Sequence, residues 1–192
     1  MKEKPPGAGG SSFQLVDFEK VVVALDLQKG ATLLDMACGE GEYTIGFSKI
    51  IGDEGLIYAV DLWEHNINRL IETLSFTGIK NVKAFVADVS KPMSIGDDSI
   101  NVCLMATVLH DLIQANTAEG AIKEAARVLK PHGLLAIIEF KKIDGPPGPP
   151  IHIRLRPQDV ERFVEPFGFN RQAMKEVGPY NYLMVFSVKD IK

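Results

Sequence analysis

Residues 33–43 read Leu-Leu-Asp-Met-Ala-Cys-Gly-Glu-Gly-Glu-Tyr. An apolar run ends at Asp35, and small residues then alternate at Ala37, Gly39 and Gly41 before a segment with helical spacing, 43–51. A strand that leads through a glycine turn into a helix is how α/β folds build a small-molecule site at the carboxyl edge of a sheet. Glycine lets the backbone approach a ligand, and the start of the helix offers unpaired N–H groups. The stretch therefore predicts a ligand site.

The spacing of the glycines argues against a dinucleotide. That fingerprint requires G-x-G-x-x-G, with the third glycine under a pyrophosphate. Counted from Gly39 and Gly41, the third position is Thr44; counted from Ala37 and Gly39, it is Glu42. The turn therefore favours a ligand without a diphosphate, and Asp35 at its start favours one that carries positive charge.

Two further apolar runs also end in carboxylates. Residues 55–60 lead into Asp61, which is placed to accept hydrogen bonds from the hydroxyls of a ribose. Residues 82–87 lead into Asp88, which is placed to receive an exocyclic amine such as that of adenine. Each carboxylate alone is weak evidence, because strands often end in Asp for turn reasons. Three in succession, the first followed by small residues, form a specific pattern.

These residues resemble the motifs of the class I S-adenosylmethionine-dependent methyltransferases. Residues 35–41 stand where that family has Asp-x-Gly-x-Gly-x-Gly, with Ala37 replacing the first glycine. Residues 99–105 resemble the family's fourth strand, with Asn101 where Asp is commoner. Residues 127–134 resemble its Arg-Val-Leu-Lys-Pro-Gly-Gly turn, with His132 in place of one glycine.

The resemblance extends over residues 22–188 and is closest to the broad group that includes ubiquinone- and menaquinone-biosynthesis methyltransferases. It implies S-adenosylmethionine as the cofactor. The residues that it assigns to cofactor binding are Asp35, Ala37, Cys38, Gly39, Gly41, Tyr43, Asp61, Leu62, Asp88, Val89, Met105 and Ala106.

The order of helices and strands predicts one α/β domain over residues 13–192, preceded by a disordered tail, 1–12. We expect strands at 31–36, 56–60, 82–87, 100–106 and 133–141, and helices at 17–26, 41–51, 63–77, 117–129 and from Pro157. The alternation implies a parallel sheet with helices on both faces, a Rossmann-like three-layer sandwich. Strands 169–177 and 180–188 flank a turn so tight that they must be antiparallel. That reversal resembles the seven-stranded methyltransferase sheet, order 3-2-1-4-5-7-6.

Composition narrows the class of protein. The chain has 192 residues, a net charge of −4 and 46% hydrophobic residues, as expected of a soluble globular protein and not of a dedicated nucleic-acid binder. No apolar run approaches the roughly 20 residues that span a bilayer. Cys38 and Cys103 are expected to be reduced, which favours a cytoplasmic location. No cluster of His, Cys and Asp has metal-ligand spacing, so no metal is expected.

His110, next to Asp111 and just past the fourth strand, is the candidate catalytic base. The alternative is that it bonds a neighbouring carbonyl or shapes the pocket. Tyr43 either bonds the ligand's amino-acid end or only packs. Glu139 and Lys141 either rim the acceptor pocket or lie on a solvated strand edge, which is the favoured interpretation.

Residues 144–150 read Asp-Gly-Pro-Pro-Gly-Pro-Pro, a stiff, extended composition. This loop either walls the acceptor pocket, so that Arg154 and Arg156 meet an anionic acceptor, or is a rigid linker with solvated arginines. The linker is favoured.

Three classes of function remain. The leading one is methyl transfer from S-adenosylmethionine to a small-molecule acceptor by in-line displacement. The second is a protein that binds the cofactor without transferring methyl. The third, a nicotinamide-dependent oxidoreductase, is disfavoured by the missing third glycine. Methyltransferases of this type recognise the acceptor through segments added to the common fold, and such segments are short here. The acceptor pocket is therefore either open or closed by a second subunit in a homodimer.

Overall fold

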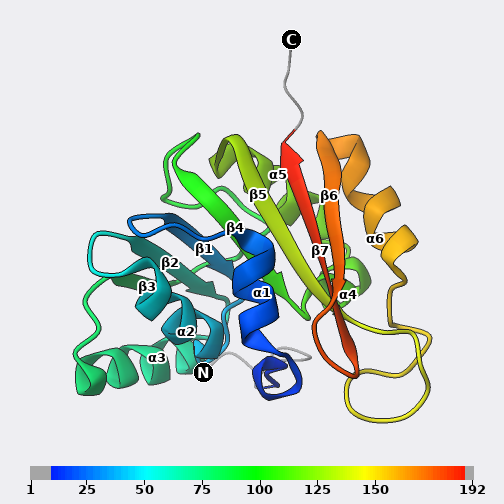
Figure 1. The fold of residues 1–192 in the computed structure, drawn as a ribbon, viewed down its shortest axis with the longest axis horizontal. Coiled ribbons are helices and arrows are strands. Elements are labelled where there is room, and N and C mark those ends of the chain that lie inside the picture. Colours follow the sequence, from blue (N-terminus) through cyan, green and yellow to red (C-terminus); the bar gives the residue numbers. More distant parts are fainter. Residues whose placement is uncertain (1–9, 189–192) are drawn as a thin grey trace.

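The computed structural model describes residues 10–188, and its centre is a seven-stranded sheet of order β3-β2-β1-β4-β5-β7-β6 (Figure 1). The strands are β1 Thr32–Met36, β2 Leu56–Asp61, β3 Val82–Val86, β4 Ile100–Ala106, β5 Leu129–Phe140, β6 Phe169–Glu176 and β7 Asn181–Val188. Strands β1 to β5 pair in parallel, whereas β7 runs antiparallel to both β5 and β6. The predicted topology and the terminal reversal are confirmed.

Helices cover both faces of the sheet, as the alternation predicts. One face packs against α1 Phe18–Leu25, α2 Glu42–Ile51 and α3 Glu64–Thr77. The other face packs against α4 Leu109–Gln114, α5 Ala118–Val128 and α6 Pro157–Val164. Along β1, Leu33 packs in the core on the side of α1 and α2, and Leu34 packs in the core on the side of α5 and α6. Successive side chains therefore enter opposite halves of the core.

Local chemistry explains where the helices begin. The Asp17 side chain caps α1 by accepting a hydrogen bond from the backbone N–H of Lys20. Pro157 occupies the first turn of α6, where its missing N–H costs nothing. Gly41 precedes α2 with φ +84°, and a Cβ there would lie 2.4 Å from Leu70 Cδ1 of α3. Glycine is therefore needed at that position both for its backbone conformation and for the packing of α3.

The structure corrects the expected boundaries at three places. Helix α4 was not predicted, because six residues are too few to show a helical period. Strand β5 starts at Leu129 rather than at 133, since Pro131 disfavours helix at the residue before it and Leu129 is already extended. The expected tail, 1–12, falls mostly on residues outside the described part of the chain, but its last residue, Ser12, is buried at 2% exposure, so the tail prediction is wrong there.

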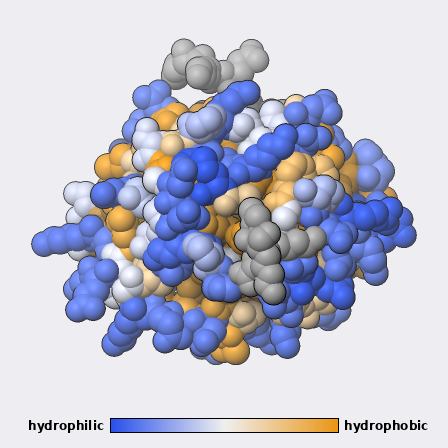
Figure 2. Space-filling model, turned by 90° about the horizontal axis from the view of Figure 1, so that it is seen from above, coloured by the Kyte–Doolittle hydropathy of each residue, from blue (hydrophilic) through white to orange (hydrophobic). Residues whose placement is uncertain are grey.

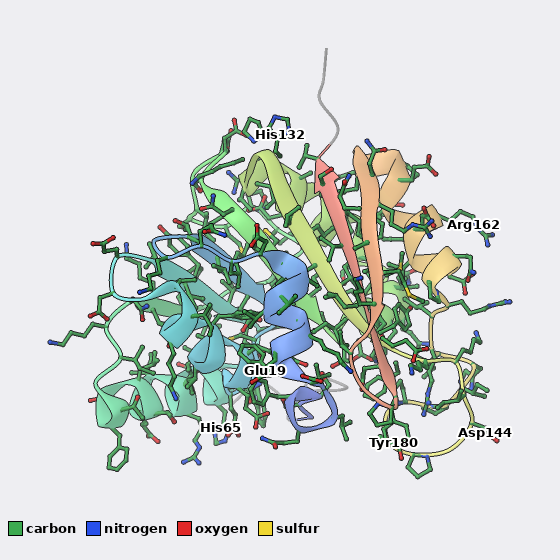
Figure 3. All side chains as sticks on the ribbon, viewed as in Figure 1. Glu19, His65, His132, Asp144, Arg162 and Tyr180 are labelled. Carbon is green, nitrogen blue, oxygen red and sulfur yellow. The ribbon has the colours of Figure 1, made fainter. Side chains whose placement is uncertain are left out.

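The sheet has one edge at which the parallel strands begin and an opposite edge at which they end, and a ligand site is expected at only one of them. His132 lies at the edge where β5 begins, far from His65, Tyr180 and Asp144 at the opposite edge (Figure 3). Viewed from the His132 edge, hydrophilic side chains predominate and hydrophobic ones appear in separate patches (Figure 2). The parallel strands end at the other edge, which is where a ligand site is expected in an open α/β sheet.

Candidate functional site

A cavity of about 530 Å³ opens at the carboxyl ends of the central strands. Its lining comes from the turns after β1, β2, β3 and β4, from the start of α3, from α4 and the residues after it, and from the N-terminal segment. The lining residues are Gly10, Ala37, Gly39, Asp61, Leu62, Asn66, Ala87, Asp88, Val89, Ala106, Thr107, Val108, Asp111, Leu112, Gln114, Ala115 and Thr117. Seven of these, Ala37, Gly39, Asp61, Leu62, Asp88, Val89 and Ala106, are residues that the sequence assigns to cofactor binding.

The turn after β1 presents backbone to the cavity. Ala37 has φ +60° and Gly39 has φ +56°, so both lie in the left-handed region that favours glycine. A Cβ built on Gly39 would meet nothing within 4 Å, so this side of the turn faces open space. Ala37 occupies the position of a family glycine and keeps the glycine conformation, at the cost of backbone strain.

Asp61, at the end of β2, joins two turns. Its Oδ2 accepts a hydrogen bond from the backbone N–H of Gly39 at 2.8 Å, and its Oδ1 accepts one from the backbone N–H of Trp63, also at 2.8 Å. A carboxylate has about four acceptor positions, so each oxygen keeps capacity for a further donor. The carboxylate is thus held in one orientation at the cavity wall.

Asp88 and Val89 form the part of the wall after β3. Asp88 Oδ1 accepts hydrogen bonds from both the backbone N–H and the hydroxyl of Ser90, at 2.9 and 2.7 Å. Val89 is 5% exposed and lies beside it on the same wall. This pair provides a fixed carboxylate next to an apolar side chain.

Asp35 lies behind the cavity rather than on its wall. It is 3% exposed, and its Oδ2 accepts a hydrogen bond from the Thr44 hydroxyl at 2.6 Å. Burial raises the pKa of Asp35 to about 6; the Thr44 hydrogen bond counteracts this shift and the Asp61 charge adds to it. Asp35 therefore connects β1 to α2 beneath the turn.

Cys38, Gly41, Tyr43 and Met105 also do not line the cavity, although the sequence assigns them to cofactor binding. Tyr43 is 5% exposed, and its hydroxyl shares a hydrogen bond with the Ser12 hydroxyl at 3.0 Å. Ser12 Oγ in turn accepts a hydrogen bond from Thr107 Oγ1 at 3.2 Å. Of the two interpretations of Tyr43, its contacts match the packing one, and it holds the N-terminal segment against the end of β4.

His110 forms a buried pair with Glu139. Its Nδ1 lies 2.8 Å from Glu139 Oε2, and its backbone N–H donates to Glu139 Oε1 at 3.1 Å. Glu139 has no exposed side-chain surface, so the favoured interpretation of a solvated strand edge is wrong for this residue. Burial by itself would lower the pKa of His110, but the hydrogen bond and charge of Glu139 outweigh it, so that pKa is raised.

Asp111 extends this pair to the cavity. His110 is not on the cavity wall, but its Nε2 lies 3.6 Å from Asp111 Oδ2, and Asp111 lines the cavity. Burial raises the pKa of Asp111, the His110 charge lowers it and the Glu139 charge raises it again, with a net upward shift. Of these two neighbouring residues Asp111 lines the cavity and His110 does not, and only the geometry of α4 shows which of the two side chains reaches the wall.

Arg154 has neither of the roles that the two interpretations of the proline-rich loop give it, an anion contact or a solvated side chain. It is 2% exposed and donates hydrogen bonds to backbone carbonyls of Lys141, Ile143, Gly145, Pro147 and Pro149. It neither meets an acceptor in the cavity nor is solvated. The guanidinium instead organises the loop around itself, while the Arg156 side chain is exposed and pairs with Asp159.

Two properties of residues 10–188 concern metals and membranes. No group of three or more His, Cys, Asp or Glu in that range is arranged to hold a metal ion. No helix in the same range combines the length and apolar character that crossing a membrane requires.

Comparison with known proteins places this geometry in a family. Residues 14–148 match the model of the ubiE/COQ5 methyltransferase family. A ubiquinone/menaquinone biosynthesis C-methyltransferase of Photorhabdus laumondii is 32% identical over 123 residues, which cover 62% of this chain and 48% of the relative. The corresponding enzyme of Neisseria meningitidis is 33% identical over 124 residues, 62% of this chain and 47% of its own. The chain thus spans about half the length of the curated relatives it matches.

A solved structure extends the similarity to nearly the whole chain. A SAM-dependent methyltransferase from Aquifex aeolicus superposes with a TM-score of 0.84 and 30% sequence identity, and the match covers 92% of each chain. The family model spans well over half of the 192 residues. The strand order and the turn after β1 indicate the same family. The chain belongs to the ubiE/COQ5 methyltransferase family.

Proposed function

We propose that this protein transfers a methyl group from S-adenosylmethionine to a small-molecule acceptor by in-line displacement. The observation that carries the proposal is the fixed carboxylate of Asp61, bonded to the backbone of the Gly39 turn and facing a cavity of about 530 Å³. The Asp61 carboxylate is oriented before a ligand binds, as expected of a pre-formed small-molecule site.

The residues present suit this cofactor. Asp61 would hold the ribose hydroxyls, and Asp88 would accept the exocyclic amine of the adenine. The open space at Gly39 leaves room for the ligand against the backbone of the turn. When bound, the cofactor supplies a methyl group on a positively charged sulfur. The acidic wall around it is then electrostatically favourable, because Asp61, Asp88 and Asp111 all line the cavity.

The acceptor end of the cavity supports a mostly apolar substrate with one acidic proton. This end is formed by α4 and the residues around it, where Val108, Leu112 and Ala115 supply apolar wall and Asp111 supplies a carboxylate. The curated relatives are named for C-methylation in ubiquinone and menaquinone biosynthesis. We therefore extend the proposal to an aromatic diol of the quinol class, in which loss of a proton makes the acceptor atom nucleophilic.

The proton-accepting group is Asp111 backed by His110 and Glu139. Asp111 faces the cavity and takes the acceptor's proton, since it is the member of the cluster on the wall. His110, held on its Nδ1 side by Glu139, presents Nε2 towards Asp111 and stabilises its carboxylate. Holding the acceptor in line with the methyl group supplies much of the remaining rate, without a covalent intermediate.

Calorimetric titration with S-adenosylmethionine, S-adenosylhomocysteine and NAD tests the cofactor. Micromolar binding of the two sulfur nucleosides without binding of NAD is the expected result. Binding of NAD alone would favour the oxidoreductase, and binding of none would overturn the proposal.

Turnover with 1,4-naphthoquinol and 1,4-benzoquinol tests the acceptor class. We expect methylation of at least one quinol, and a fall in kcat of about 100-fold in Asp111→Asn, within the usual range for removal of a general base. The control is Asp53→Asn, an exposed loop residue outside the cavity. Cofactor binding without methylation of either quinol would overturn the assignment of the acceptor to the quinol class.

A further inference from the structure

One polar side chain in the cavity wall lacks a hydrogen-bond partner. Asn66 lies in the first turn of α3, is 1% exposed and lines the cavity. Its Oδ1 is buried and finds no donor within residues 10–188. Its backbone N–H is satisfied by the Trp63 carbonyl at 3.0 Å, so the unpaired buried atom is the side-chain Oδ1.

Such a group lowers the stability of the free protein. Buried polar atoms in folded proteins are almost always hydrogen-bonded, and one that is not costs free energy. The neighbouring helix positions, Ile67 and Leu70, are buried and apolar and offer no partner. A hydrophobic residue would suit this position better if packing were its only role, so the amide points to a ligand that completes it.

The position of Asn66 indicates which part of a ligand it meets. Asp61 and Leu62 lie on the same wall, five and four residues before it, at the junction of β2 and α3. Asp61 offers only acceptor atoms, whereas an amide offers both a donor and an acceptor. A hydroxyl is the ligand group that is also both, and two adjacent hydroxyls on a sugar can reach a carboxylate and an amide at once.

We propose that the Asn66 side chain binds a ribose hydroxyl of the nucleoside ligand and makes this site selective for ribonucleosides over deoxyribonucleosides. The proposal rests on the proposed function, since it assumes a nucleoside in this cavity. It adds a residue for which the cofactor motifs of the sequence provide no signal.

Replacement of Asn66 by leucine, a side chain of similar size, separates a ligand role from a structural one. In Asn66→Leu the unpaired Oδ1 is gone, so the midpoint of thermal unfolding of the free protein is expected to stay level or rise. The dissociation constant for S-adenosylhomocysteine is expected to rise about tenfold, because one buried hydrogen bond to the ligand is lost. A residue needed only for folding would lower the midpoint instead.

A second measurement needs no change of the chain. Calorimetric titration of the wild-type protein with adenosine, 2′-deoxyadenosine and 3′-deoxyadenosine is expected to show at least tenfold weaker binding of one deoxynucleoside. In Asn66→Leu, and in Asn66→Ala should the leucine variant fail to fold, that difference is expected to shrink by about threefold or more, and the intact Asp61 accounts for the remainder. Asn68→Leu is the matched control, since Asn68 is exposed on the same helix and lies off the cavity wall.

The outcomes are distinct. Unchanged binding of S-adenosylhomocysteine in Asn66→Leu, or a deoxynucleoside penalty that persists in full, overturns the role of Asn66 and leaves the proposed function standing. Absence of S-adenosylhomocysteine binding by the wild-type protein overturns the proposed function as well. Weakening in Asn66→Leu together with equal weakening in Asn68→Leu also contradicts the assignment.

Discussion

The Asp61 carboxylate accepts the backbone N–H of Gly39 at 2.8 Å across 22 residues of chain. This hydrogen bond ties the turn after β1 to the turn after β2, so the two sides of the cavity are positioned by one side chain. A change at Asp61 therefore affects both the ligand contacts and the shape of the turn.

Asp61→Ala is expected to weaken binding of S-adenosylhomocysteine by about tenfold to 100-fold, because contacts to the ligand and the hold on Gly39 are lost together. Calorimetric titration measures the change, with Asp53→Ala as the exposed control. Wild-type affinity in Asp61→Ala would mean that the ligand lies elsewhere.

Ala37→Gly is expected to stabilise the protein by about 1 kcal/mol, since Ala37 holds a φ of +60° that an L-residue adopts at a cost. Urea unfolding gives the free energy. Ala126→Gly, inside helix α5, is the comparison and should destabilise by a similar amount. If both glycine variants lose stability equally, the turn is not strained.

Asp35→Asn is expected to flatten part of the pH dependence of stability. Burial raises the pKa of Asp35 to about 6, against 3.8 in the unfolded chain, so the folded state binds this proton more tightly. The stability from that proton is present below pH 3.8 and is lost as the pH rises through about 6. The free energy of unfolding of Asp35→Asn, relative to that of wild type, should therefore increase by up to about 3 kcal/mol between pH 4 and pH 8. Urea unfolding at several pH values measures the gain, which should be absent in Asp53→Asn.

Glu139→Gln is expected to lower the pKa of His110, because the partner that outweighs its burial loses its charge. Protonated His110 stabilises the wild-type fold below about pH 6.5, and this contribution is lost as the pH rises through the raised folded-state pKa. The variant should thus lose more stability at pH 5.5 than at pH 8.5. Titration of the imidazole resonances by NMR checks the pKa, and Glu176→Gln, an exposed acid, should leave it unchanged.

Arg154→Leu is expected to destabilise the protein by about 3 kcal/mol or more, because it leaves several carbonyls of the 141–149 loop without their donor. Urea unfolding and the rate of proteolysis within 141–153 report the effect. Arg156→Leu, at an exposed position, should change stability by less than about 0.5 kcal/mol. Equal losses in the two variants would contradict a role for Arg154 in organising the loop.

The edge of the sheet that holds the cavity was predictable from apolar runs that each end in a carboxylate. Parallel strands end at one edge, so Asp61 and Asp88 had to lie near each other once their strands were identified. The same reasoning placed Asp35 at that edge but not on the wall. Which of two consecutive residues faces a cavity depends on how the strand end twists and on what packs beneath it, here Thr44.

The acceptor side was less predictable. His110 was visible as a candidate only from its place after a strand, and nothing in the spacing indicated that Glu139, 29 residues later, would bury its carboxylate against it. Because β4 and β5 are neighbours, their ends bring the two side chains together. The pairing is a property of the sheet order and not of either segment.

By itself the sequence determined the alternation of strands and helices, the antiparallel ending and the edge that carries the site, because these follow from periodicity, turn residues and chain direction. Only the tertiary structure decided that Arg154 lies inside its loop, that Asp111 rather than His110 lines the cavity, and that Oδ1 of the wall residue Asn66 is left unpaired. Periodicity specifies which face of an element is buried, whereas the partner of a buried polar group is chosen by contacts between distant segments, which exist only once the chain has folded.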